Sequence, residues 1–315
     1  MRRAGTRPEI SESTAIKAAH PRAGAWAASL DQWPLRLVFG ILVVSLLASG
    51  PGRAATPPQR VVSLNPCLDA ILLQVADPGQ IAALSHYSQD PRQSPIADIA
   101  RRYPFTWGSA EEIVALKPDL VLISGMGAMA LTAVLPRLNI RHASFDVPAS
   151  IDESLAQVTR VAELVGHPDR GAALKARILA AIAAAAPRPG EPRLGALIYE
   201  YHGIASGPGT LMNELMDRAG FDNFARRYGL THTVPVPLEA LIADPPQVLL
   251  AGRLAPNEPV WADRELSHPI LRALPPRVRR ETFPEQLMFC GGPSMIAAVA
   301  AMAEARENAL KGVSR

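Results

Sequence analysis

The chain has 315 residues, of which 48% are hydrophobic and 19% charged, a balance typical of globular proteins and a length sufficient for two domains. The pI of about 9.1 suggests a nucleic-acid partner, but residues 1–54 carry seven Lys/Arg and only three Asp/Glu, which leaves 25 basic and 26 acidic residues in the remainder. The remainder is nearly neutral and has no basic stripe with interleaved aromatics, which argues against nucleic-acid binding.

The first 54 residues have the features of an export signal. Arg36 precedes a 12-residue apolar run, residues 37–48, which is too short to span a bilayer and has the length of a signal-peptide core. Residues 52–54 offer a small-x-small cleavage site, so we expect a mature chain that begins at Ala55. No cysteine directly follows the apolar run, so we expect no lipid anchor and predict a soluble protein of the periplasm. The 36 residues before the run are long for such a leader and suggest an upstream start codon.

Short apolar strands alternate with helices between residues 61 and 145. We expect strands at residues 61–64, 80–84, 119–124 and 141–145, with helices at about 65–73, 111–116 and 128–138. Because no hairpin signal intervenes, this alternation predicts right-handed crossovers and a parallel sheet. Residues 86–107 form a long irregular segment that contains several aromatics, which is typical of a functional loop.

Two helices are predicted between residues 150 and 187. Ser150 or Asp152 can cap the first helix, and Gly166 ends it. The second helix starts at Pro168 and is rich in alanine, the residue with the best helix propensity. At about 1.5 Å per residue it would span roughly 28 Å, close to the width of a small domain. We interpret it as a rigid connector between two similar lobes, although this stretch alone equally allows an ordinary surface helix.

The alternation of strands and helices restarts after the connector. We expect strands at residues 193–200, 247–252 and 279–283, and helices at residues 211–219, 238–242, 267–274 and 293–310. Residues 111–119 and 237–246 repeat one pattern, an acidic helix followed by proline and an aliphatic strand. The predicted fold is therefore α/β, with two Rossmann-like lobes that contain parallel sheets and are joined by one long connecting helix. Its parts are a leader at 1–54, an N-terminal lobe at 55–149, the helices including the connector at 150–187, and a C-terminal lobe at 188–315.

Several segments occur in an order that resembles a known family. These are RVVSLNPCLDAILL, LKPDLVLIS, GPGTLMNELMDRAGFDN and the closing CGGP. In this order and spacing they are similar to the substrate-binding protein of an ABC importer, in the class with a rigid inter-lobe helix that binds cobalamin, ferric siderophores or haem. The resemblance covers about residues 60–310. It implies a periplasmic protein, monomeric and without a resident cofactor, that captures a metal chelate between its lobes and delivers it to a permease and its ATPase.

The resemblance and the general rule for open parallel sheets both place the ligand at the carboxyl ends of the strands. The candidate ligand-binding residues are Asn65, Cys67, His86, Tyr87, Trp107, Gly125, Tyr201, His202, Arg253, Phe289 and Cys290. Aromatic side chains suit a flat macrocycle because they offer a large rigid area, although any one of them could equally be a core residue.

The resemblance also implies one acidic permease-docking residue on each lobe. The usual glutamate position of the first lobe holds Ala70, so the neighbouring Asp69 is the candidate there. In the second lobe the candidates are Glu214 and Asp217.

The two cysteines, Cys67 and Cys290, are open to three interpretations. They could form a disulfide, as is natural in an exported protein, line the site as two free thiols, or lie buried and unrelated. The histidines show no metal-site spacing, so we expect no structural zinc site.

The alternative function is a secreted enzyme that uses a thiol or a histidine in the same cleft. The sequence has no G-x-S-x-G motif, and the glycine-rich turn at residues 207–210 lacks the lysine of a phosphate-binding loop. We therefore predict a binding protein and not an enzyme.

Overall fold

The computed structural model describes residues 56–125, 129–200, 203–252 and 274–313. The predicted leader, most of the helix expected at 267–274, and the candidates Tyr201, His202 and Arg253 lie outside the described residues. In the described ranges, no helix is long and apolar enough to cross a membrane.

The first sheet is parallel throughout, and its strand order is β3-β2-β1-β4-β5. Its strands are β1 (Val61–Ser63), β2 (Ile81–Ser85), β3 (Phe105–Thr106), β4 (Leu120–Ser124) and β5 (His142–Phe145). The helical segments around it are α2 (Pro66–Val75), η1 (Pro78–Gln80), η2 (His86–Gln89), α3 (Ala97–Ala100), α4 (Ala110–Leu116), α5 (Met129–Val134) and η4 (Leu135–Leu138).

Both faces of this sheet are buried, which explains its uninterrupted apolar strands. Val61 belongs to a core cluster with Leu68 of α2, whereas the next residue, Val62, belongs to a second cluster with Ile113 of α4. Successive side chains of a strand point to opposite faces, so neighbouring residues of the run belong to different clusters, whereas alternate residues share one.

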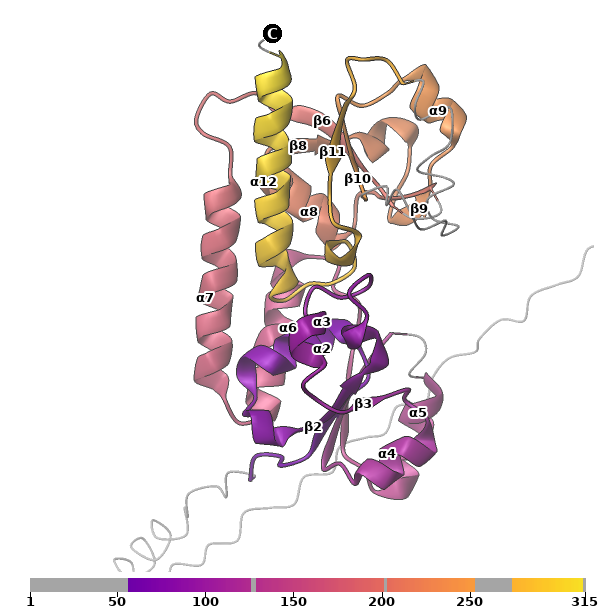
Figure 1. The fold of residues 1–315 in the computed structure, drawn as a ribbon, viewed down its shortest axis with the longest axis vertical. Helices are drawn as coiled ribbons and strands as arrows, with labels where there is room; N and C mark the ends of the chain where they lie inside the picture. Colours follow the sequence, from indigo (N-terminus) through magenta and orange to yellow (C-terminus); the bar gives the residue numbers. More distant parts are fainter. Residues whose placement is uncertain (1–55, 126–128, 201–202, 253–273, 314–315) are drawn as a thin grey trace, which may run out of the picture. The chain divides into compact units, whose positions relative to one another are not determined.

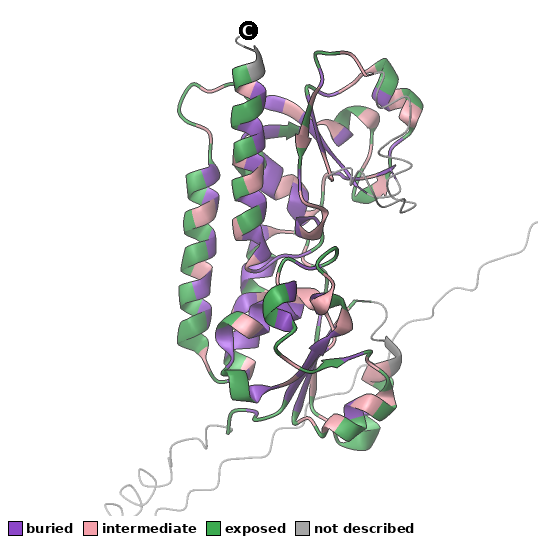
Figure 2. Cartoon of the chain, in the orientation of Figure 1, coloured by how far each residue is buried: buried purple, intermediate pink, exposed green. Residues whose placement is uncertain are grey.

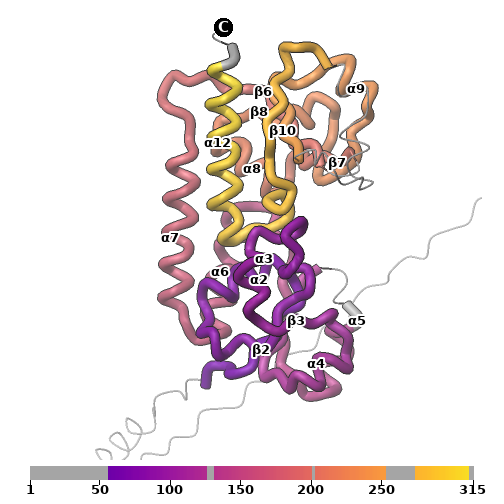
Figure 3. Tube along the Cα trace, in the orientation of Figure 1, coloured from indigo at the N-terminus to yellow at the C-terminus, as the bar shows by residue number. Residues whose placement is uncertain are grey.

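The two helices α6 (Ile151–Leu164) and α7 (Pro168–Ala185) connect this sheet to a second one. Helix α7 contacts α2 beside the first sheet and α8 (Leu211–Arg218) and α12 (Ser294–Val313) beside the second, so it reaches both. Figures 1 and 3 show α7 running alongside α6 and then α12. Its buried residues, Gly171, Leu174, Ile178, Ile182 and Ala185, recur every three or four positions and form the stripe visible in Figure 2. Alanines fill much of the exposed side, where propensity rather than packing favours the helix.

The second sheet is mixed, in the order β11-β10-β6-β7-β9, with β8 also pairing with β6. Its strands are β6 (Leu194–Tyr199), β7 (Ile204–Ser206), β8 (Phe221–Asn223), β9 (Thr233–Pro235), β10 (Val248–Ala251) and β11 (Arg279–Thr282). Its remaining helical segments are η6 (Phe224–Tyr228), α9 (Leu238–Ala243) and η7 (Glu285–Leu287).

One strand of this sheet, β7, runs opposite to all the others and differs from the all-parallel expectation. Strand β7 is antiparallel to β6, and β9 is antiparallel to β7. The chain reverses direction between β6 and β7, where Gly203 N–H donates to the carbonyl of Glu200 (3.1 Å). Gly203 has φ 68°, a backbone conformation that favours glycine. The sequence lacks a strong hairpin signal at this place, so the reversal was not predicted.

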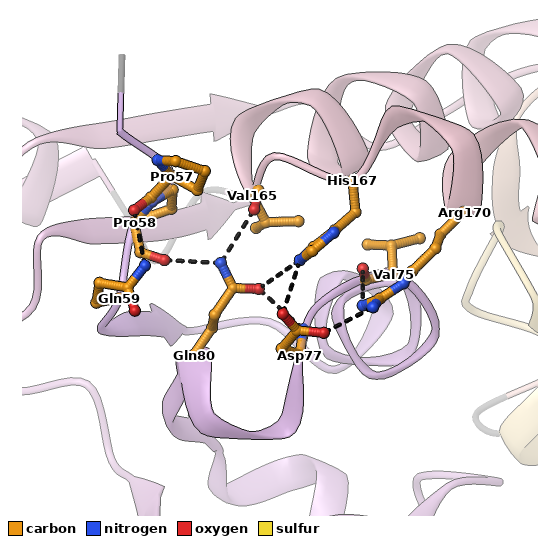
Figure 4. A network of polar contacts seen from close by, with 9 residues as sticks. All are labelled: Pro57, Pro58, Gln59, Val75, Asp77, Gln80, Val165, His167 and Arg170. Atoms are coloured by element: carbon orange, nitrogen blue, oxygen red, sulfur yellow. Dashed lines mark hydrogen bonds and ion pairs between the residues drawn. The ribbon is translucent and has the colours of Figure 1, made fainter. Parts of the chain in front are cut away.

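A polar network holds the first turn of α7 against the first sheet (Figure 4). The buried Gln80 side chain donates to the carbonyls of Pro58 (2.7 Å) and Val165 (3.0 Å). Asp77 forms ion pairs with Arg170 (2.7 Å) and His167 (3.2 Å), and the hydrogen bond from Arg170 lowers the pKa of Asp77. These contacts join the segment before β1, the end of α2 and the corner between α6 and α7.

Arg306 of α12 holds the other end of α7. Its buried guanidinium donates through Nη1 to the carbonyls of Ala185 (3.0 Å), at the end of α7, and Ala219 (2.6 Å), after α8. Both are helix C-terminal carbonyls, which have no partner within their own helix and carry partial negative charge. Arg306 therefore connects three helices of the second half of the chain.

A disulfide bond joins the two halves directly. Cys67, in the first turn of α2, is bonded to Cys290, just before α12, with their Cα atoms 5.0 Å apart. The next residues also lie in the contact, because a Cβ on Gly291 would overlap Ser154 of α6 and a Cβ on Gly292 would come within 2.8 Å of Ile71 of α2. The CGGP segment is thus a site of close approach that requires glycine.

Replacing Arg306 by methionine should lower the free energy of unfolding by about 3 kcal/mol, because two buried carbonyls lose their donor. This corresponds to a fall in Tm of about 10 °C, measurable by calorimetry. Lys311→Met removes a cation from an exposed position of the same helix and should shift Tm by less than about 2 °C. Equal shifts for both variants would contradict the assigned role of Arg306.

The disulfide closes a loop of 223 residues, so its loss should destabilise the protein by up to about 5 kcal/mol in the chain-entropy model. A Cys67→Ser/Cys290→Ser double variant should show this loss in urea unfolding. In the unmodified protein, thiol titration in denaturant should detect no thiol before reduction and two afterwards. Two thiols before reduction would show that the bond is not formed.

Candidate functional site

A cleft of about 920 Å³ lies where the strands of the first sheet end. Residues that follow each of the five strands, or end them, line it: Leu64 after β1, His86 after β2, Trp107 after β3, Ser124 in β4 and Val147 after β5. In the order β3-β2-β1-β4-β5, the chain leaves β1 towards one side of the sheet and leaves β4 towards the other. The switch point between β1 and β4 is the position at which open parallel sheets bind ligands. The strand order therefore explains the position of the cleft.

Aromatic rings in mutual contact form one wall of this cleft. The ring of His86 lies 3.9 Å from that of Tyr87 and 4.1 Å from that of Trp107, centroid to centroid. Phe105 meets Trp107 edge-on at 6.0 Å. Trp107 is 67% exposed and Tyr87 46%, which is unusual for rings of this size and leaves part of each ring accessible to a ligand. We call His86, Tyr87 and Trp107 the aromatic wall.

A carboxylate from α4 holds the Trp107 segment in place. Glu112 Oε2 accepts hydrogen bonds from Thr106 Oγ1 (2.7 Å), Trp107 N–H (2.8 Å) and Gly108 N–H (3.2 Å). These bonds favour the ionised carboxylate, and the one from Thr106 contributes most to lowering its pKa. The backbone that carries the exposed Trp107 side chain is therefore held in place by hydrogen bonds to Glu112.

A second carboxylate, that of Asp69, holds the turn that carries His86 and Tyr87. Asp69 is fully buried in α2, and its Oδ2 accepts from Ser85 N–H (2.8 Å) and Ser88 Oγ–H (2.6 Å). Burial raises the pKa of Asp69 to about 7, against the opposing effect of its hydrogen bonds. Ser85 in turn caps η2, because its Oγ accepts from Tyr87 N–H (3.4 Å).

The opposite side of the cleft comes from the segment between β11 and α12. Among the described residues of the second half, Glu285, Phe289 and Cys290 line the cleft, and Phe289 is 55% exposed. The disulfide joins this segment to α2, whose first turn is capped by Asn65 Oδ1 accepting from Cys67 N–H (2.9 Å). Glu214 of α8 adds a further bond between the halves, accepting from Ile151 N–H of α6 (2.5 Å).

The structure brings together seven of the candidate ligand-binding residues. Those that line the cleft are Asn65, Cys67, His86, Tyr87, Trp107, Phe289 and Cys290. Gly125 is described but does not line the cleft, whereas its neighbour Ser124 does. Tyr201, His202 and Arg253 cannot be placed, because they lie outside the described residues.

The disulfide resolves the three interpretations of the cysteines. Cys67 and Cys290 are bonded to each other, so neither is a free thiol and neither is unrelated to the other. A thiol-dependent enzyme therefore has no nucleophile here. Within the described residues, no group of three His, Cys, Asp or Glu side chains could hold a metal ion.

The docking prediction for Asp69 was wrong. Its carboxylate is fully buried and hydrogen-bonded inside the first lobe, so it presents no charge at the surface. Glu214 is half-buried and bonded to the start of α6. Asp217 is 69% exposed and forms an ion pair with Arg193 (2.7 Å), so it is the candidate that remains at the surface.

Sequence reasoning missed several residues of the cleft. These are Leu64, Leu68, Arg92, Gln93, Gly108, Ser124, Leu131, Val147, Pro148, Gln157 and Glu285. The strand-end rule could have found Val147 and Pro148, which directly follow the last strand of the first sheet. No comparable signal marks Gln157, which reaches the cleft from within α6.

The raised pKa of Asp69 predicts how stability varies with pH. The folded protein retains this proton up to about pH 7, whereas the unfolded chain loses it near pH 3.8, so stability should fall as pH rises through that window. From this group alone, the free energy of unfolding should be about 2 kcal/mol lower at pH 8 than at pH 5.5.

Asp69→Asn should remove this dependence, because the amide oxygen can accept the same two hydrogen bonds without charge. Urea unfolding at both pH values gives the change in the free energy of unfolding for each protein. Subtracting the change in the variant from the change in the unmodified protein removes the contribution of all other titrating groups. The two proteins should differ in free energy of unfolding by different amounts at the two pH values. An equal difference at both would contradict the burial of a titrating carboxyl at position 69.

Comparisons with known proteins agree with this architecture. Among solved structures, the periplasmic heme-binding protein RhuT from Roseiflexus sp. RS-1 is 25% identical with a TM-score of 0.63, covering 78% of this chain and 98% of its own. A periplasmic heme-binding protein from Pseudomonas aeruginosa is 22% identical with a TM-score of 0.62, covering 79% and 92%. The periplasmic vitamin B12-binding protein BtuF of Vibrio cholerae is 18% identical with a TM-score of 0.58, covering 81% and 99%.

No curated protein sequence matches the chain. The family model of the periplasmic binding proteins matches residues 61–276, from the first strand of the first sheet to beyond β10 of the second. Together with two parallel-rich sheets joined by α6 and α7 and a cleft at the strand ends, this match shows that the chain belongs to the periplasmic binding protein family.

Proposed function

We propose that this protein captures a flat metal chelate, a haem or a corrinoid, and delivers it to an ABC importer. The observation that carries the proposal is the aromatic wall of His86, Tyr87 and Trp107, which faces a cleft of about 920 Å³. Stacked rings offer a flat macrocycle a large contact area at low entropic cost. The heme- and B12-binding relatives named above support this class of ligand, and a ferric siderophore with catechol rings is the third candidate.

The polar groups of the cleft are few, as expected where apolar contact supplies the affinity and polar groups fix orientation. Arg92 and Gln93 come from the loop after η2, and Gln157 comes from α6. Arg92 also forms an ion pair with Asp90 (2.8 Å) and is 69% exposed. A cationic side chain at this edge suits a ligand that carries peripheral carboxylates, such as the propionates of haem.

The disulfide and the anchored helix α7 favour a cleft that is formed before the ligand arrives. A preformed site binds with less loss of conformational entropy than one that must close. Capture in this protein would therefore depend on stacking into an existing gap and only weakly on movement of the lobes.

Export through the leader at residues 1–54, the periplasmic location of the mature monomer and its docking to a permease with an ATPase belong to the same proposal. Asp217, on the exposed side of α8, is the carboxylate most accessible to a permease arginine. Glu214 would first have to release Ile151 N–H. Charge reversal at Asp217 should therefore reduce uptake without changing ligand affinity.

Ligand titration tests the proposed function directly. Haemin, cyanocobalamin and a ferric tris-catechol complex are each added to the purified protein and followed by their visible absorption. One of them should bind stoichiometrically and without turnover. Trp107→Ala should weaken that binding by about 10- to 100-fold, since stacking of one aromatic ring is worth roughly 1–3 kcal/mol.

Ile99→Ala is the matched control, because Ile99 is an exposed apolar residue of the same lobe that does not line the cleft. It should leave affinity unchanged. Failure of all three ligands to bind, or equal binding by the Trp107 variant and the unmodified protein, would contradict the proposal.

A further inference from the structure

The proposed function leaves one buried titratable group of the cleft region unused, the carboxyl of Asp69. It lies in the first turn of α2, next to Cys67 and Leu68, which line the cleft, but it has no exposed surface itself. A fully buried carboxyl without a cationic partner is rare, because burial disfavours its charge. Its retention directly beneath a binding site therefore suggests a role beyond packing.

The hydrogen bonds of Asp69 lead to one segment of the cleft. Its Oδ2 accepts from Ser85 N–H and Ser88 Oγ–H, the residues on either side of His86 and Tyr87. The bond from Ser88, at 2.6 Å, has the length of a charge-assisted O–H···O bond. An ionised Asp69 thus holds both ends of the turn that carries two residues of the aromatic wall.

The second oxygen of this carboxyl, Oδ1, can take up a proton. Asp69 Oδ1 and the Oγ of Ser63 in β1 are both buried and have no hydrogen-bond partner among the described residues. Ser63 nevertheless lies close enough to lower the pKa of Asp69, so the two groups are neighbours. When Asp69 is ionised, the Ser63 hydroxyl is the donor available to Oδ1, whereas a proton on Oδ1 can donate to Ser63 Oγ instead.

No charged group dominates this environment. The groups that act on the carboxyl are Ser63 from β1, Ser85 from β2 and Ser88 from η2, all of them uncharged. Burial is the largest influence and raises the pKa of Asp69 to about 7. His86 is the titratable side chain of the adjoining turn itself.

We propose that Asp69 is a positioning residue that makes ligand affinity depend on pH, because its ionised form holds the His86–Tyr87 turn in the binding geometry and its protonated form loosens it. This inference rests on the proposed function of the cleft. On protonation, Oδ2 loses its charge and its bonds to Ser85 and Ser88 weaken, while the new proton is drawn towards Ser63. Affinity should therefore fall as the pH drops below neutrality.

The first arm of the test needs no ligand. The amide resonance of Ser85 is followed by NMR from about pH 5.5 to pH 8.5 in the unmodified protein and in Asp69→Asn. Because Ser85 N–H donates to Asp69, its shift should titrate with a midpoint near neutral pH in the unmodified protein and not in the variant. Absence of this titration in the unmodified protein overturns the proposal.

The second arm measures haemin affinity at the two ends of this pH range. The ratio of haemin affinities between the unmodified protein and Asp69→Asn should be close to one at pH 5.5 and at least about threefold at pH 8.5. Both proteins keep every other titratable group, so any pH dependence from those groups or from haemin cancels in this ratio. Ser88→Ala should reduce affinity mainly at the higher pH. Ser94→Ala changes a buried serine of the same loop whose hydroxyl accepts from Ile96 N–H, and it should behave like the unmodified protein.

The outcomes distinguish a failure of the proposed function from a failure of the role proposed for Asp69. A ratio that is the same at both pH values, with intact haemin binding, overturns the role of Asp69 and leaves the proposed function standing. If haemin binds at neither pH, both the haem assignment and the pH coupling of its affinity are overturned. The Ser85 titration then shows whether Asp69 still controls the turn, which tells the two failures apart.

Discussion

Helix α7 is bonded at each end to a different half of the chain, and this double anchorage determines how the two sheets are spaced. Its first turn binds Asp77 and Gln80 beside the first sheet through His167 and Arg170. At its other end, the carbonyl of Ala185 accepts from the buried Arg306 of α12. The disulfide adds a covalent link at the cleft itself. Because these links lie far apart along the fold, rotation of one half about any single link would break another.

The two sides of the cleft are built differently. The first half supplies an aromatic wall, and each of its segments is held by a buried or well-bonded carboxylate, Glu112 under Trp107 and Asp69 under His86 and Tyr87. The described part of the second half supplies one short segment, residues 285–290, which the disulfide holds near α2. Exposed rings on firmly bonded backbone are what a preformed binding surface requires, since an unsupported ring would lose much of its contact energy to ordering.

Two of the three candidate docking carboxylates have contacts that differ from those that their place in the sequence suggests. Asp69 occupies the region where a docking carboxylate was expected, but it points into the lobe and is bonded to the next strand. Glu214 was expected at the surface and instead caps α6, joining the two halves. In both cases the alternation of strands and helices indicates the element but not which side of it faces inward, and that side decides the role of the carboxylate.

The sequence by itself determined the α/β class, the positions of most strands and helices, and the strand ends that carry His86, Tyr87 and Trp107. These follow from local information, namely apolar runs, caps and the alanine-rich connector, which act over a few residues. Only the tertiary structure decided which cysteine interpretation holds, that β7 runs antiparallel to its neighbours β6 and β9, that Asp69 is buried, and that Val147 and Gln157 reach the cleft. Each of these depends on contacts between residues far apart in the chain, such as Cys67 with Cys290, and no local pattern encodes such a distance.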